Sequence, residues 1–456
     1  MTARFLMIAL DGADGALLDR WSGDGTLPHL GALRARGTTA RLSAPPGITD
    51  DALWASFQYA AGLGEHGRYH FLQRLRSGAM GMVHRDEADR DAFWDRLSSL
   101  GLRVAVFDVP KCRAPRPING IHLADWLVHG RYFRAPKSHP EALAADVVAR
   151  FGPAPPSRCD REGPALEDAE VLEVATHLRT GVARKRAAGV HYLASDTWDL
   201  FIIGFKEAHC AGHTLWDLAD PRHADHDASR AARLGEPLRA IFQDLDAAVG
   251  ELVAAAGPQA VVAVFATTDL EPNATLVHLM PEIVNRLNRA LGETPLDRAL
   301  IRIRRRLSPA TAYRRCELLP YNENCSALRI NPQGLFRPAR EEAVRRARML
   351  DQVETRLREL TDADTGGPVV AAIDRPSADQ VGTRRAALPD LLVRYAAGTF
   401  PSAVVSPRLG RIEAERPPVR PGNHAAGGFL ITAGEPAAGV TAMEDFGPMA
   451  ARVLEG

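Results

Sequence analysis

Three histidines have the spacing and the positions expected of metal ligands. His209 and His213 lie four residues apart, so on a helix both imidazoles share one face, about one turn apart, and can reach the same ion. The pair follows an apolar run at residues 200–205, and His424 shortly precedes another run at 428–432. The same residues are compatible with surface or hydrogen-bonded histidines, so both interpretations stay open.

Carboxylates stand at comparable places in the chain. Asp11 follows an apolar run at 5–10, Glu207 follows the run at 200–205, and Asp269 comes shortly after a run at 260–265. Ligands of doubly wound sheets bind beyond the carboxyl ends of the strands, so these segments could bring carboxylates and imidazoles to one edge. Asp11 alone is equally compatible with an Asx turn or a helix cap.

Thr49 and Asp50 begin a stretch with a helical pattern, residues 50–61. The simplest interpretation of Thr49 is an N-cap, whose side chain bonds the first backbone N–H groups of the helix. The functional interpretation uses the same position differently. A hydroxyl at a helix N-terminus lies where an anion is stabilised, and a nearby metal could turn it into a nucleophile.

Strands alternate with helices along most of the chain, and this pattern has to position those residues. It predicts βαβ units and a mostly parallel central sheet with helices on both faces, an α/β fold. The expected strands are 5–10, 103–109, 200–205, 260–265, 390–395 and 428–432. The expected helices are 28–36, 50–61, 91–100, 140–150, 166–188, 228–255 and 340–362.

The composition is that of an ordinary globular protein and excludes several classes. The 456 residues are 46% hydrophobic and 25% charged, which argues against a disordered, collagenous or coiled-coil chain. Lys+Arg and Asp+Glu are both 56, so no net field attracts nucleic acid or an anionic membrane. No GxGxxG follows a strand, so a dinucleotide site has no support.

Cysteine usage and the lack of long apolar runs bear on the compartment. The five cysteines are scattered and form no CxxC pair, which argues against a disulfide framework or a cysteine zinc site. No apolar run approaches the length of a membrane span, and the apolar stretch at 5–10 is too short for a signal peptide. We therefore expect a cytoplasmic enzyme.

A locally basic stretch stands out at residues 286–315. It holds nine arginines against one glutamate and one aspartate. One interpretation is a lid that attracts an anionic substrate. The other is a solvated helix in an insertion, with apolar positions Val284, Leu287, Leu291, Leu300, Ile303 and Leu307 on one side. We expect a single domain over 1–456, with 280–325 as an inserted basic lid or cap.

Several blocks, in order, resemble the alkaline phosphatase superfamily, and most closely its type I phosphodiesterase/nucleotide pyrophosphatase branch. Residues 8–12 resemble the segment with the first metal aspartate, and 49–57 resemble the nucleophile block. Segment 198–216, with His213, resembles the "WDLFxxxFxxxDxxxHxxW" pattern, and His424 resembles the late histidine ligand. Further blocks that match are 26–37, 66–71, 119–126, 327–334 and 388–391. The resemblance implies an alkaline phosphatase-like fold with inserted helical lid segments.

The resemblance also implies a two-zinc site and a role for several residues. Asp11 would serve the metal on the nucleophile side, and Thr49 would be the nucleophile. His213 and His424 would hold the second metal. Counting back from Trp54, however, places Asp50 at the threonine position, and Thr49 fits only with one inserted residue.

The departures from the family pattern change the expected metal set. The aspartate four residues before His213 is His209 here, so His209, His213 and His424 could form a three-histidine zinc site with an open fourth position. The family's Asp-His pair near residue 267 is missing, and Asp269 is the candidate replacement. Asp11, Thr49 and Asp269 would offer oxygen donors only, which suit Mg²⁺ or Mn²⁺.

Three functional hypotheses follow. The first is a metal-dependent hydrolase of phosphate diesters or monoesters, or of sulfate esters, with one zinc in the three-histidine site. Glu207, Asp11 or Asp269 would be its acid/base candidates. The second is a superfamily member that catalyses another reaction on an anionic metabolite, and the third is a non-catalytic protein. We expect a small anionic substrate as partner, no nucleic acid and no membrane, and homo-oligomers are compatible with the sequence.

Overall fold

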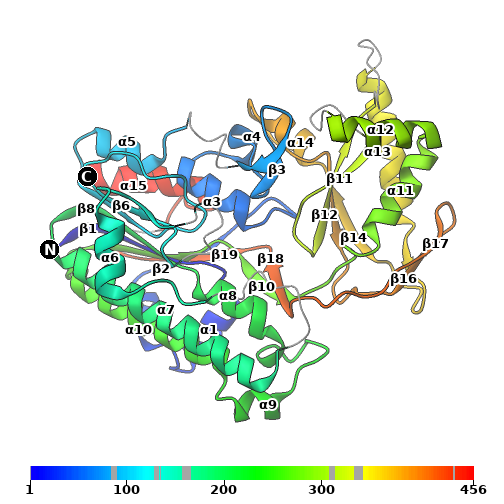
Figure 1. The fold of residues 1–456 in the computed structure, drawn as a ribbon. Coiled ribbons are helices and arrows are strands. Elements are labelled where there is room, and N and C mark those ends of the chain that lie inside the picture. Colours follow the sequence, from blue (N-terminus) through cyan, green and yellow to red (C-terminus); the bar gives the residue numbers. More distant parts are fainter. Residues whose placement is uncertain are drawn as a thin grey trace. The chain divides into compact units, whose positions relative to one another are not determined.

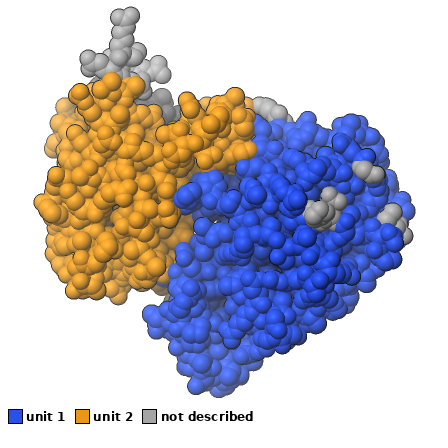
Figure 2. Space-filling model, turned by 180° about the vertical axis from the view of Figure 1, so that it is seen from behind, with its two compact units in different colours: residues 1–61, 87–272, 419–456 blue, residues 62–86, 273–418 orange. Residues whose placement is uncertain are grey.

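The computed structural model describes residues 2–83, 90–127, 133, 135–156, 166–307, 314–332, 342–434 and 437–455. The chain divides into two compact units, coloured separately in Figure 2. Unit 1 comprises 1–61, 87–272 and 419–456, and unit 2 comprises 62–86 and 273–418. All the candidate site residues of the sequence analysis belong to unit 1.

Unit 1 is built on a central sheet. Within the described residues the sheet has eight strands in the order β2-β19-β9-β1-β8-β5-β6-β7. The five inner strands β9, β1, β8, β5 and β6 are parallel, whereas β19, β2 and β7 pair antiparallel at the two sides. Their bounds are β1 (Ala3–Leu10), β2 (Thr38–Leu42), β5 (Val104–Phe107), β6 (Gly120–Ala124), β7 (Lys137–His139), β8 (Trp198–Phe205), β9 (Val261–Ala266) and β19 (Gly428–Ala433).

The central strands are almost continuously apolar because helices cover both faces of the sheet. Every residue of β1 from Phe5 to Leu10 is buried, and so is every residue of β8 from Leu200 to Phe205. A parallel strand buried on both faces needs this pattern. The predicted mostly parallel α/β sheet is confirmed.

The helices of unit 1 form the two outer layers. In Figure 1, α7 and α10 run along one face of the sheet, and α3, α5 and α15 lie on the other. The helices are α1 (Gly15–Gly23), α2 (Pro28–Arg36), α3 (Asp50–Tyr59), α5 (Phe93–Ser99), α6 (Leu143–Phe151), α7 (Asp168–Ala194), α8 (Glu207–Leu215), η2 (Trp216–Leu218), α9 (Ala228–Arg233), α10 (Pro237–Ala256), η5 (Met443–Asp445) and α15 (Phe446–Glu455).

The predicted helix 228–255 was wrong as a single element. It is split into α9 and α10 at Gly235 and Glu236, which both have positive φ (76° and 48°). Pro237 then opens α10 at a position that proline favours. A glycine and a proline two residues apart thus interrupt an apolar pattern that is otherwise periodic.

Unit 2 has its own sheets and its own core. Within the described residues, β11, β12, β15 and β14 form a four-stranded antiparallel sheet, so the predicted strand 390–395 (β15) does not belong to the central sheet. The elements are α4 (Leu63–His66), β3 (Leu72–Arg74), β4 (Met80–Met82), α11 (Met280–Ala290), α12 (Pro295–Leu307), β11 (Cys316–Leu319), β12 (Cys325–Ile330), α13 (Glu342–Arg358), β13 (Thr361–Asp362), β14 (Val370–Asp374), α14 (Pro376–Asp379), η4 (Arg385–Ala387), β15 (Leu391–Tyr395), β16 (Ala403–Ser406) and β17 (Gly410–Glu413).

The basic stretch is two helices rather than one. Gly292, with φ of 84°, and Pro295 separate α11 from α12. The apolar positions therefore do not share a side: Leu287 is buried, whereas 56% of Ile303 is exposed. Residues 308–313 lie outside the described part of the chain. The lid role predicted for 280–325, and the single-domain organisation, stay predictions.

No helix among the described residues is long and apolar enough to span a bilayer.

Candidate metal centre and active site

The carboxyl ends of three adjacent parallel strands bring distant segments together. β1 ends at Leu10 and leads into Asp11, β8 leads into α8, and β9 leads into Thr267. The Asp11 N–H donates to the carbonyl of Phe205 at 2.7 Å, which fixes Asp11 beside the start of α8. Gly12 has φ of 61°, and a Cβ there would lie 2.8 Å from the His209 Cα. A glycine is therefore required where α8 passes the turn.

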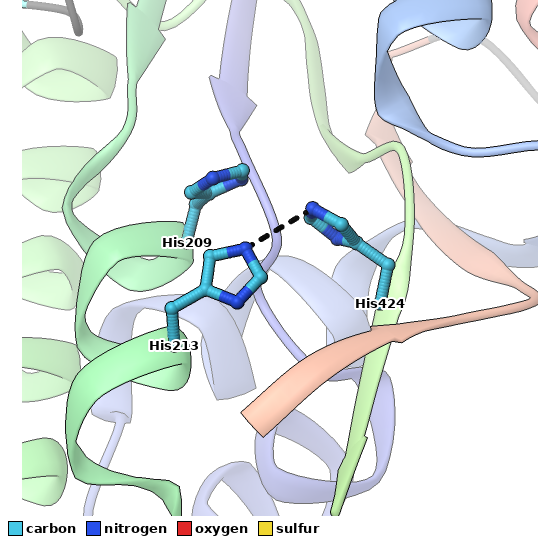
Figure 3. A group of neighbouring side chains, drawn as sticks. All are labelled: His209, His213 and His424. Atoms are coloured by element: carbon cyan, nitrogen blue, oxygen red, sulfur yellow. Dashed lines mark hydrogen bonds between the residues drawn. The ribbon is translucent and has the colours of Figure 1, made fainter. Parts of the chain in front are cut away.

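Three imidazoles converge at this edge. His209 and His213 come from successive turns of α8, and His424 comes from β18 (Gly422–Ala425), which pairs antiparallel with β10 (Asp269–Pro272). Figure 3 shows the three rings pointing toward one another. Their centroids are 4.6–4.7 Å apart, and all three side chains are buried.

The outer ring nitrogens of two histidines are held by hydrogen bonds. His213 Nδ1–H donates to the carbonyl of Gly422 at 2.8 Å, and His424 Nδ1 is 3.0 Å from Thr268 Oγ1. Burial lowers the pKa of His213 well below its ordinary value, with a further contribution from Arg420, and it lowers the pKa of His424 to about 4. Both rings are therefore neutral near pH 7, and the Nε2 atom of His213 carries a lone pair.

The Nε2 atoms of His213 and His424 face each other at 3.2 Å (dashed in Figure 3). Four ligand atoms bound tetrahedrally to zinc at about 2.0–2.1 Å lie roughly 3.3–3.4 Å from one another. The separation of the two nitrogens, their burial and their neutral state fit a shared cation. One ring nitrogen from each of the three histidines lies within 4.8 Å of the other two, so His209, His213 and His424 could hold one metal ion.

Two carboxylates extend the site on the side of β1. His209 Nδ1 lies 3.4 Å from Asp11 Oδ2 and 3.7 Å from Asp50 Oδ2, and the three residues form a second group with ligand spacing. Asp50 Oδ1 lies 3.6 Å from His424 Nε2. Asp50 thus stands between the two groups, and His209 belongs to both.

Asp11 has one oxygen that is engaged and one that is not. Its Oδ1 accepts from Trp54 Nε1 at 2.9 Å and from Thr267 Oγ1 at 3.3 Å. Its Oδ2 is buried without a hydrogen-bond partner among the described residues. Burial and the neighbouring charge of Asp50 raise the pKa of Asp11 to about 7. A buried acceptor in this state is what a cation would satisfy.

Thr49 and Asp50 take different positions at the start of α3. Thr49 is the N-cap residue, but its side chain makes no capping bond, and its buried Oγ1 has no hydrogen-bond partner among the described residues. Asp50 is the first helical residue and faces the imidazoles. Of the two candidates for the nucleophile position, the structure thus brings Asp50 to the histidines.

Lys111 is a site residue that the sequence analysis missed. Its ammonium group donates to Asp50 Oδ2 and lies 3.1 Å from Asp51 Oδ1, and all three side chains are at least 95% buried. It follows β5, at the same sheet edge as Asp11. Two features of the sequence could have identified Lys111 as a site residue. It follows an expected strand, and lysine is scarce in this chain.

Two predicted residues lie apart from this cluster. The Asp269 carboxylate accepts the Gly15 N–H at 2.8 Å and pairs with Arg41, and it belongs to neither ligand group. Glu207 is buried at the start of α8, but its carboxylate points toward α7, where a Cβ on Gly181 would lie 2.8 Å from Glu207 Oε1. The structure therefore does not bring either residue to the imidazoles.

Comparison with known proteins agrees with this architecture. The family model for type I phosphodiesterase/nucleotide pyrophosphatase matches residues 5–312. The chain belongs to this family. Membership confirms the expected superfamily and makes the protein a hydrolase of the phosphoryl-transfer type. No curated protein matches the sequence.

Solved structures of the same fold cover nearly the whole of this chain. Phosphonoacetate hydrolase from Sinorhizobium meliloti, in complex with phosphonoformate, is 13% identical, with a TM-score of 0.57 over 99% of this chain and 96% of that one. Murine ectonucleotide pyrophosphatase/phosphodiesterase 5 is 9% identical, with a TM-score of 0.54 over 99% and 95%. At these identities the likeness shows the fold.

Proposed function

We propose that this phosphodiesterase-family protein is a metal-dependent hydrolase of phosphate esters whose ion is held by His209, His213 and His424. The observation that carries the proposal is the convergence of three buried imidazoles with two buried carboxylates at the sheet edge where such folds bind ligands. Zinc is the ion we propose, because nitrogen ligands from three histidines suit it.

A divalent ion in this position supplies Lewis-acid stabilisation to a phosphoryl oxygen. The chain's own residues supply the rest. Asp50 is the carboxylate beside the imidazoles, so we assign it the role of the general base that accepts a proton from the attacking water. Lys111 holds Asp50 in place through the hydrogen bond to Oδ2. Asp11 is the second carboxylate within reach of His209.

A second candidate function is favoured by one observation. The residue that faces the imidazoles at the start of α3 is a carboxylate, whereas the Thr49 hydroxyl has no hydrogen-bond partner among the described residues. A carboxylate at this position can act as a general base, whereas the family reaction uses a hydroxyl nucleophile there. The site is therefore compatible with a different reaction on an anionic metabolite.

We further propose a small anionic substrate, a cytoplasmic location and self-association.

The discriminating experiment uses the full chain, freed of metal with a chelator and reconstituted with zinc. We expect hydrolysis of at least one member of a panel comprising bis(p-nitrophenyl) phosphate, p-nitrophenyl phosphate, p-nitrophenyl sulfate and phosphonoacetate. His213→Ala, carried through the same reconstitution, is the matched negative control. Bound zinc without turnover of any substrate would favour the second candidate. If the chain binds no metal, the result would support the hypothesis of a non-catalytic protein.

A further inference from the structure

Lys111 occupies an unusual place for an ammonium group. Its side chain is buried, with 5% exposed, and it reaches the Asp50 and Asp51 carboxylates at the start of α3. The Lys111 backbone has φ of 53°, a left-handed conformation that non-glycine residues adopt only when surrounding structure imposes it. The fold therefore fixes this positive charge at the edge of the metal centre.

Among the described residues, the group of Asp11, Asp50 and His209 has few ligand atoms of its own for a second ion. His209 is shared with the three-histidine group. Asp50 Oδ2, the oxygen 3.7 Å from His209 Nδ1, is the same atom that accepts from Lys111. Asp11 Oδ1 is already bonded to Trp54 and Thr267. Asp11 Oδ2 is buried without a hydrogen-bond partner among the described residues, so it is the carboxylate oxygen that this group can offer to an ion.

Electrostatics disfavours a second divalent ion at that place. An ion bound to Asp50 Oδ2 would share one oxygen with the Lys111 ammonium, and two cations this close in a buried site repel strongly. The ammonium is a compact point charge with three donors, so it can serve two carboxylates at once, as it does with Asp50 and Asp51. It supplies a permanent charge where an exchangeable ion would otherwise be needed.

We propose that Lys111 takes the place of a second metal ion, so that the protein binds one divalent cation, at His209, His213 and His424. This inference rests on the proposed metal site. It assigns Lys111 a positioning role: the lysine orients and neutralises the Asp50 carboxylate. It also predicts that the charge on the Asp50 side is present whether or not metal is supplied.

The test counts bound ions. Wild type, Lys111→Met and Lys111→Arg are equilibrated with excess Mn²⁺ after loading with zinc, dialysed, and analysed for metal by mass spectrometry. We expect one ion per chain in the wild type and in Lys111→Arg, and two in Lys111→Met, whose unfolding temperature should rise with added Mn²⁺. The exposed Lys137 offers the matched control, because Lys137→Met removes a lysine outside the site.

Two ions in the wild type would overturn the inference, and so would a folded Lys111→Met variant that still binds only one. If Lys111→Met does not fold, the double variant Lys111→Met/Asp51→Asn removes one charge of each sign and is judged by the same count. The proposed function is tested by a separate outcome. Hydrolysis with two bound ions would overturn this inference alone, whereas one bound ion without hydrolysis would overturn the function alone.

Discussion

The Nε2 atoms of His213 and His424 lie 3.2 Å apart although the residues are 211 positions apart in the chain. One ring is locked by the Gly422 carbonyl and the other contacts the Thr268 hydroxyl. Without an ion, His424 Nε2–H can donate to the lone pair of His213 Nε2, and a cation bound by both nitrogens would replace this hydrogen bond. This relationship is the basis for the predictions about metal binding.

Removing the contact to His424 should weaken metal binding without removing a ligand. In Thr268→Val the His424 ring loses the hydroxyl 3.0 Å from Nδ1, and loss of such an outer partner typically costs about 10–100-fold in metal affinity. Competition with a chromophoric chelator measures the affinity. Thr176→Val is the control, since that hydroxyl bonds its own helix at Leu172. Equal affinities in all three proteins would contradict the assignment.

Asp50 and Thr49 should differ sharply in their effect on turnover. Asp50→Asn keeps the shape of the side chain but removes the base, and such losses lower rates by about 10²–10⁴-fold. Thr49→Ala should change the rate by less than about tenfold, since the hydroxyl makes neither a capping bond nor any other hydrogen bond among the described residues. The value of kcat on the best substrate decides the question. The reverse order of effects would return the nucleophile role to Thr49.

Asp269 should matter for stability and not for metal. Its carboxylate accepts the Gly15 N–H, and its partner Arg41 is 57% exposed, so Asp269→Ala should cost about 1–2 kcal/mol of unfolding free energy. Zinc content should stay at the wild-type level. Asp19→Ala is the matched control, because that carboxylate is 58% exposed and its pair with Arg34 should contribute less than about 1 kcal/mol. A loss of zinc in Asp269→Ala would restore it as a ligand.

His122 should make the metal-free protein sensitive to acid. Burial, with the charge of Arg113, lowers the pKa of this β6 histidine to about 3. Its neutral form therefore stabilises the fold above pH 6.5, and this contribution is lost as the pH falls from 6.5 toward 3, because the unfolded chain takes up the proton first. Between pH 7 and 5 the loss amounts to about 2 kcal/mol.

Urea unfolding of metal-free wild type and His122→Gln at both pH values measures this contribution. The glutamine cannot be protonated, so the difference between pH 7 and 5 should be smaller in the variant by about that amount. The other histidines are the same in both proteins, so their contributions cancel in the comparison. Parallel losses of stability in the two proteins would contradict the prediction.

The sequence predicted the fold well wherever a pattern was local. The strand at 5–10 lies within β1, and the helix 28–36 matches α2 to the residue. His209 and His213 could be paired because four residues on a helix make one turn. The failure at 228–255 has a local cause as well, the break at Gly235 and Pro237.

The rest of the site depends on contacts between segments distant in sequence. Lys111 could not be assigned because only the sheet brings the segment after β5 to α3, and its partners Asp50 and Asp51 are 61 and 60 positions away. Asp269 looked like a replacement ligand, but Gly15 and Arg41, from α1 and β2, engage its carboxylate. Of the four lysines in the chain, Lys111, Lys185 and Lys206 are buried.

Zinc K-edge X-ray absorption on the protein loaded with zinc tests the three-histidine centre most directly. We predict three imidazole nitrogens at about 2.0–2.1 Å from the zinc. His424→Ala should lose one imidazole from that shell, or lose the zinc. A shell with fewer than two imidazoles in the wild type, or a protein that retains no zinc after dialysis, would contradict the three-histidine centre.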